Sequence, residues 1–120
     1  MPIVAAHVLL YTTEAERLRA VLRDVFGWKH VEDPGSDPGW LIFALPPAEL
    51  GVHPSDGSTR HQLSLMCDDV HATKAELESK GVEFRGEPED TGFGIAVTMV
   101  LPGGVEMLLY EARHASPLDL

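Results

Sequence analysis

The chain has 120 residues, of which 44% are hydrophobic and 23% are charged, the composition of an ordinary small globular domain. Nineteen acidic residues against nine basic ones give a formal net charge of −10, which repels phosphate backbones and anionic lipid headgroups and so excludes nucleic acid and membrane surfaces as partners. No apolar run approaches the roughly 18 residues of a membrane span, and the single cysteine, Cys67, excludes an internal disulfide. These features favour a cytoplasmic protein.

The first half of the chain predicts a strand, a helix and then three further strands. An apolar run over residues 7–11 is followed by Thr13-Glu14-Ala15-Glu16, which has the form of a helix-starting capping box. Apolar residues then recur at helical spacing up to Gly27, which is expected to end the helix. The three strands that follow are predicted over residues 28–32, 40–45 and 50–53.

The second half repeats this order. A strand is predicted over residues 63–67, and a helix is expected to begin at Asp68-Asp69 and to end at Gly81. Residues 86–94 are predicted to form a long loop, and the tail after Arg113 is expected to be loose. The remaining strands are predicted over residues 82–84, 95–101 and 105–110, with a turn at 102–104.

The two helix-ending glycines lie 54 residues apart, close to half the chain, which indicates an internal duplication. We therefore predict one α+β domain over residues 1–120, made of two tandem βαβββ modules at about 3–54 and 61–112. Their strands are expected to form a curved, mostly antiparallel sheet around a cavity, with the helices on the outer face. The polar segment from Pro54 to Arg60 would link the modules.

Side chains alternate between the two faces of a strand, which separates core residues from cavity residues. The helix-facing set is expected to include Val8, Leu10, Leu50, Val52, Leu63 and Met107. The cavity-facing set is expected to include His7, Tyr11, His53, Gln62, Glu106, Leu108 and Tyr110. His61 falls on the side opposite Gln62. Trp40 and Phe93 flank loops at the cavity mouth, where aromatic rings either stack on a ligand or pack against the protein.

Two imidazoles, one carboxamide and one or two carboxylates in one cavity suit a divalent metal of the Zn, Fe, Mn or Ni type. The alternative is that each histidine is a hydrogen-bonded structural residue. No nucleophile motif is present, because Cys67 falls on the core-facing side of its strand.

Three segments resemble the vicinal oxygen chelate superfamily, which includes glyoxalase I, extradiol dioxygenases, fosfomycin-resistance enzymes and the metal-free bleomycin-resistance proteins. They read HVLLYTTEAERLRAVLRDVFGWK, HQLSLMCDDVHATKAELESKGVEF and LPGGVEMLLYE. The resemblance implies metal ligands at His7, His53 and Gln62, and a further glutamate six residues after Pro102. That position is Leu108, and the nearest carboxylate on the same strand face is Glu106.

Three hypotheses for the function follow. The first is a metal-dependent lyase, isomerase or dioxygenase in which His7, His53 and Gln62 hold the metal and Glu106 is the base or the fourth ligand. The second is a metal-free protein that sequesters a small organic molecule, and the third is a structural or regulatory domain. In the first two, Tyr11, Trp40, Phe93, Leu108 and Tyr110 would contact the small molecule. The resemblance also implies a homodimer.

Overall fold

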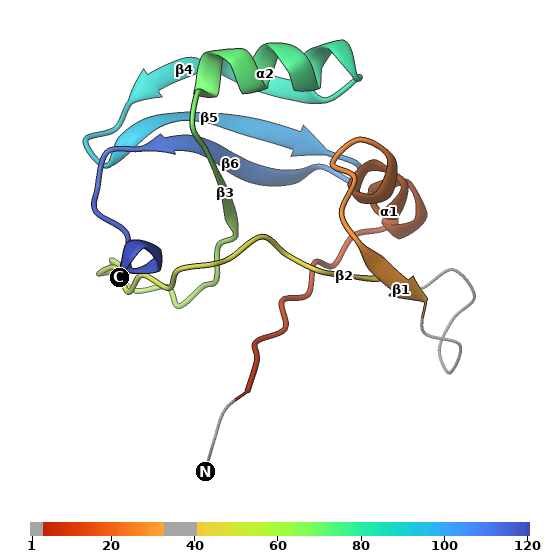
Figure 1. Cartoon of the computed structure of the whole chain (residues 1–120), viewed down its shortest axis with the longest axis horizontal. Coiled ribbons are helices and arrows are strands. Elements are labelled where there is room, and N and C mark those ends of the chain that lie inside the picture. Colours follow the sequence, from red (N-terminus) through yellow and green to blue (C-terminus); the bar gives the residue numbers. More distant parts are fainter. Residues whose placement is uncertain (1–3, 33–40) are drawn as a thin grey trace.

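The second half of the chain forms a complete βαβββ unit in the computed structural model, which describes residues 4–32 and 41–120 (Figure 1). Its elements are β3 (Ser64–Cys67), α2 (Val70–Ser79), β4 (Glu83–Asp90), β5 (Gly94–Leu101) and β6 (Val105–Ala112). The first half contributes α1 (Ala15–Asp24), β1 (His30–Glu32) and β2 (Leu41–Phe43), and a short 3-10 helix, Pro117–Asp119, follows β6. Helices and mostly antiparallel strands in separate runs confirm the predicted α+β class.

The main sheet has four strands in the order β3-β6-β5-β4. The β3 and β6 strands run parallel, and the other neighbours are antiparallel. One row of the register joins Ser64, Leu108, Thr98 and Arg85 across all four strands. The α2 helix lies over one face of this sheet, and α1 lies near the end of the β5–β6 hairpin (Figure 1). Neither helix of the described ranges is long and apolar enough to cross a membrane.

A single apolar core joins both helices to the main sheet. Met99 of β5 and Val70 of α2 have no exposed surface, and α1 contributes Leu18 and Leu22. The other buried members are Leu77, Val82, Val97, Leu101, Met107 and Leu109. Helix α1 therefore packs onto the core of the second half, although it belongs to the first half of the chain.

The first half differs from the prediction at two of its four strands. The segments predicted as strands over residues 7–11 and 50–53 are not paired with any strand of the described chain. Leu50 and Val52, predicted to be core, are 92% and 94% exposed, and Val8 is 51% exposed. A strand forms only where a neighbour accepts its backbone hydrogen bonds, and the described residues supply no such neighbour here. The paired part of this half is the two-stranded β1–β2 sheet.

The predicted loop over residues 86–94 is also wrong, because β4 continues to Asp90. Gly86, with a positive φ of 73°, and Pro88 gave this segment the composition of a loop. An edge strand tolerates both residues, since one side of its backbone has no ladder bonds to lose. The β4–β5 register shifts between Arg85 and Glu89, which marks an irregularity at these residues.

The helix ends follow the sequence more closely. The carboxylate of Asp69 accepts a hydrogen bond from the Ala72 amide at 3.0 Å, so the predicted start of α2 is confirmed. Gly27 and Gly81 have φ values of 69° and 91°, the left-handed conformation that ends helices and that glycine adopts without strain.

The shared core predicts that Leu22→Ala destabilises the whole domain by about 2–5 kcal/mol, because it removes buried methyl groups and leaves a cavity. Leu120→Ala makes the same chemical change at a fully exposed position and should alter stability by less than about 0.5 kcal/mol. Urea unfolding followed by circular dichroism measures both. Equal midpoints would contradict the packing of α1 on the core.

Candidate functional site

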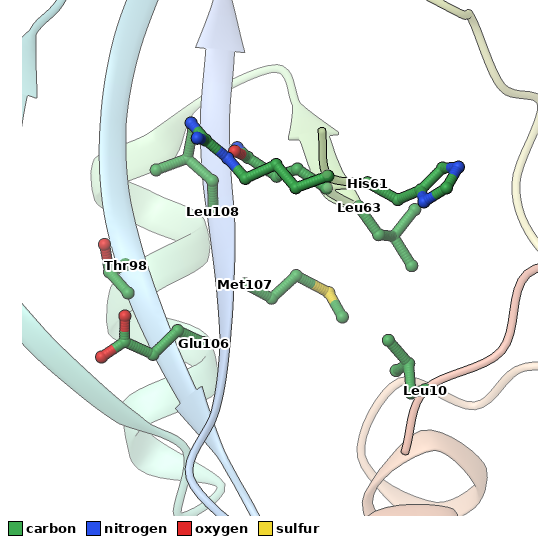
Figure 2. Close-up of a pocket in the computed structure, with 9 residues that line it drawn as sticks. Leu10, His61, Leu63, Thr98, Glu106, Met107 and Leu108 are labelled. Carbon is green, nitrogen blue, oxygen red and sulfur yellow. The ribbon is translucent and has the colours of Figure 1, made fainter. Parts of the chain in front are cut away.

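A pocket of about 570 Å³ opens beside the first half of β6 (Figure 2). Its position follows from the strand register. The β3 strand begins to pair with β6 at Leu108, so Glu106 and Met107 pair with β5 but have no partner on the β3 side. The pocket's lining residues are Leu10, Arg60, His61, Gln62, Leu63, Thr98, Glu106, Met107 and Leu108.

The pocket wall divides into an apolar part and a polar part. Figure 2 shows Leu10 across from Met107 and Leu63, and it shows Glu106 beside Thr98 on the neighbouring strand. Leu108 and Glu106 lie on one side of β6 and Met107 on the other, as strand alternation requires. The pocket therefore offers a molecule both aliphatic surface and hydrogen-bonding groups, the usual character of a small-molecule site.

Glu106, the predicted catalytic carboxylate, forms an ion pair with Arg85 of β4. The pair spans the β5 strand between them, and both side chains are about half exposed or more. The guanidinium balances the negative charge of this carboxylate. Sequence reasoning missed Arg85 because the predicted strand ended at Phe84.

The pocket contains three of the predicted site residues, namely Gln62, Glu106 and Leu108. The Gln62 amide donates to the Ser64 hydroxyl at 3.3 Å. His7 and His53 are exposed and do not line the pocket, and His53 Nδ1 lies 2.8 Å from the Pro54 carbonyl. Tyr11 is 86% exposed, and Trp40 lies outside the described residues.

Phe93 and Tyr110 form an aromatic pair farther along β6. Their rings meet edge to face with centroids 5.3 Å apart, and the Tyr110 hydroxyl lies 3.2 Å from His114 Nε2. Burial raises the pKa of the Tyr110 phenol, and the nearby Glu49 carboxylate raises it further. Glu49 also accepts a 2.5 Å hydrogen bond from Ser116. The tail is thus held to the body of the protein, contrary to the expectation that it is loose.

The pocket's donor set does not fit a divalent metal. Within residues 4–32 and 41–120, no three His, Cys, Asp or Glu side chains gather in a group that could hold an ion. In the pocket itself, Glu106 is engaged by Arg85, and Leu108 stands where the resemblance implies a carboxylate. Metals of the Zn, Fe, Mn or Ni type need three or more nitrogen, sulfur or anionic oxygen ligands.

Sequence reasoning missed most of the other lining residues. Arg60 and His61 precede the first residue of β3, so strand alternation does not govern them, and Figure 2 shows the His61 ring turned away from Leu108. Leu10, Leu63 and Met107, predicted to face only the helices, reach both the core and the pocket. The sequence could have identified Thr98 as a lining residue, because it is the one polar residue in the predicted strand over residues 95–101.

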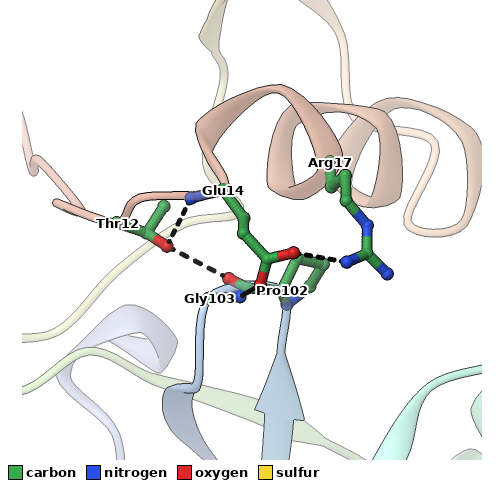
Figure 3. Close-up of polar contacts among 5 residues, drawn as sticks. All are labelled: Thr12, Glu14, Arg17, Pro102 and Gly103. Carbon is green, nitrogen blue, oxygen red and sulfur yellow. Dashed lines mark hydrogen bonds and ion pairs between the residues drawn. The ribbon is translucent and has the colours of Figure 1, made fainter.

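The wall that carries Leu10 is tied to the β5–β6 turn by a small polar junction (Figure 3). The Thr12 hydroxyl accepts from the Glu14 amide at 3.2 Å and donates to the Pro102 carbonyl at 3.4 Å. The Glu14 carboxylate accepts from the Gly103 amide at 2.6 Å and pairs with Arg17. The predicted capping box is therefore wrong, because Glu14 is the N-cap residue and its side chain makes no cap hydrogen bond to the helix backbone.

The comparisons with known proteins agree on one family. The model of the Glyoxalase/Bleomycin resistance protein/Dioxygenase superfamily matches residues 5–107. TnmS3, an antibiotic binding protein from Streptomyces sp. CB03234, is 26% identical, with a TM-score of 0.62 over 92% of this chain and 99% of that chain. A glyoxalase/bleomycin resistance protein from the same Streptomyces strain is 28% identical, with a TM-score of 0.56 over 83% of this chain and 93% of that chain.

A superfamily member from Sphaerobacter thermophilus is 23% identical, with a TM-score of 0.66 over 91% of this chain and 98% of that chain, and it shows the fold alone. No curated protein sequence matches the chain.

The junction predicts that Gly103→Ala destabilises the protein. Gly103 has a φ of 86°, and an added Cβ would overlap the hydroxyl oxygen of Thr12. We expect a loss of about 2–4 kcal/mol, the sum of left-handed backbone strain and overpacking. Urea unfolding measures it.

Gly104→Ala is the matched control, since Gly104 has a φ of 73° but nothing within 4 Å of an added Cβ. It should show the backbone strain alone, about 1 kcal/mol. Thr12→Ala should relieve part of the Gly103→Ala defect in the double variant. If the two glycine variants lose the same stability, the contact between Thr12 and the turn is not a close one.

Proposed function

Because the chain belongs to the glyoxalase/bleomycin resistance protein/dioxygenase superfamily, we propose that it binds a small organic molecule in the β6 pocket without a resident metal ion. The protein would act by sequestering that molecule. The observation that carries the proposal is the pocket itself, whose wall holds Leu108 at the position where the resemblance implies a metal-binding carboxylate.

The chemistry of the wall supports binding over metal-assisted catalysis. Four apolar side chains, those of Leu10, Leu63, Met107 and Leu108, supply the area that drives association of an organic molecule. Glu106, the one carboxylate among the described lining residues, is held by Arg85 and is not free to move a substrate proton. The likeness to TnmS3, an antibiotic binding protein, supports a binding role for this chain as well.

The compartment we propose is the cytoplasm. Cys67 is the single cysteine of the chain, and burial raises the pKa of its thiol, which keeps it in the less reactive protonated form. Such a cysteine suits a reducing environment.

The binding proposal predicts that the neutral fluorescent probe N-phenyl-1-naphthylamine binds the protein with micromolar affinity, unchanged by a chelator. Leu108→Trp fills the pocket and should weaken this binding at least about tenfold, because the bulkier ring takes the space of the probe. Fluorescence titration measures the affinity, and circular dichroism checks that the variant is folded. Ser79→Trp, on the exposed end of α2, is a control that should bind as the original protein does.

Elemental analysis of protein purified without an affinity tag separates the alternatives. We expect far less than one equivalent of metal. One equivalent of Zn, Fe, Mn or Ni, lost in a His7→Ala/His53→Ala double variant, would contradict the proposal and favour the metal-dependent enzyme.

We also propose that the protein is a homodimer. Two segments of the first half expose large apolar side chains that a monomer would leave in water, those of Val4, Val8, Leu9, Leu50 and Val52. Neither segment pairs with a strand of the described residues, so a second copy would cover the apolar side chains and supply the missing strand partners.

The dimer proposal predicts twice the monomer mass of 13.1 kDa in light scattering at micromolar concentration. Val52→Asp should shift the mass toward the monomer, because it would bury an unpaired charge in the interface. Leu120→Asp places the same charge at an exposed position outside both segments and should remain dimeric. A monomeric mass for the original protein would contradict the proposed dimer.

A further inference from the structure

We infer that the β6 pocket selects aromatic carboxylates, and that Arg60 binds the carboxylate group. This inference rests on the proposed function, because it names the class of molecule that the same pocket takes. Three features of the described residues carry it: an uncommitted guanidinium, a neutralised carboxylate and an apolar wall that contains a thioether.

Arg60 stands out in the charge balance of the chain. Acidic residues outnumber basic ones by nineteen to nine, so most cations find a carboxylate. Ion pairs hold six of the basic residues: Arg17, Arg23, Lys74, Lys80, Arg85 and Arg113. Arg60 forms no hydrogen bond or ion pair with any described residue, yet it lines the pocket. A guanidinium presents a planar fork of donors that matches a carboxylate in two parallel hydrogen bonds.

The carboxylate of Glu106 would repel an anion if it were free. Arg85 neutralises it, so the described lining residues and Arg85 together bring two guanidinium groups and one carboxylate to the pocket. The Thr98 hydroxyl, which has no hydrogen-bond partner among the described residues, adds a donor on the same wall. The pocket is thus locally cationic in a protein of net charge −10.

The apolar wall indicates which kind of molecule would carry the negative charge into the pocket. Leu10, Leu63 and Leu108 offer aliphatic surface, and the Met107 thioether makes favourable contacts with aromatic rings. A volume of about 570 Å³ is within the range of small-molecule sites and holds a fused-ring body. A carboxylate monoanion is preferred to a phosphate dianion here, because the second charge would lose hydration beside the leucines without a second free cation to pair with.

Three ligands with the same ring system and different charges test the inference: 2-naphthoate, 2-naphthamide and 2-naphthylmethylammonium. Isothermal titration calorimetry at low salt should give 2-naphthoate an affinity at least about tenfold above that of the neutral amide, as expected for a charge-assisted hydrogen bond. The ammonium ligand should bind most weakly. Added salt should reduce the advantage of the carboxylate and leave the amide unchanged.

Arg60→Gln should remove most of the carboxylate's advantage while the amide binds as before, and Arg60→Lys should restore part of it, because a lysine keeps the charge without the planar fork. Lys29→Gln is the matched control. Lys29 is exposed and does not line the pocket, so this variant makes the same change in net charge and should keep the full preference.

Two sets of outcomes separate the inference from the proposed function. Equal affinities for the carboxylate and the amide, or a preference that survives Arg60→Gln, would overturn the inference while pocket binding stands. Failure of all three ligands to bind, or binding that Leu108→Trp does not weaken, would overturn both the inference and the proposed function.

Discussion

The register between β3 and β6 determines where this protein has a pocket. The two parallel strands begin to pair at Ser64 and Leu108, which leaves the first residues of β6 bonded on the β5 side alone. The chain segments that precede β3 and α1 lie away from this edge of β6, so the edge stays open and borders the pocket. Had β3 begun a few residues earlier, its backbone would have filled the space that Glu106 and Met107 now line.

The opposite wall depends on a second constraint, the attachment of α1 to the body of the protein. Leu18 and Leu22 bury one face of the helix in the shared core, and Thr12 and Glu14 bind the β5–β6 turn just before the helix begins. Leu10 lies two residues before that junction and therefore reaches the pocket. The first half of the chain contributes to the site through this short anchored segment, although two of its predicted strands have no partner strand in residues 4–32 and 41–120.

Patterns within a few residues of the sequence correctly predicted the helix ends and the alternation of side chains along β6. Asp69 as the cap of α2, Gly27 and Gly81 as helix ends, and the alternation that puts Glu106 and Leu108 on one side of β6 all follow from spacing within a few residues. The predictions that were wrong concern residues whose positions depend on partners distant in the sequence. Whether Val52 is buried is decided by a neighbouring strand that the spacing of Val52 does not reveal. For the same reason, Arg60 could not be assigned to the pocket, since its place follows from where β3 starts to pair with β6.

The charges of the site are arranged around Leu108. In the register, Leu108 lies between Ser64 and Thr98, in a row that ends at Arg85, so an apolar side chain separates two hydroxyl-bearing neighbours. A carboxylate at position 108 would lie in the same row as Arg85, which could then pair with it and leave Glu106 free. With leucine there, Arg85 pairs with Glu106 instead. Leu108 gives the pocket an apolar centre, and Arg85 engages the one carboxylate among the described lining residues, so Arg60 is the charge at the pocket wall that no described residue balances.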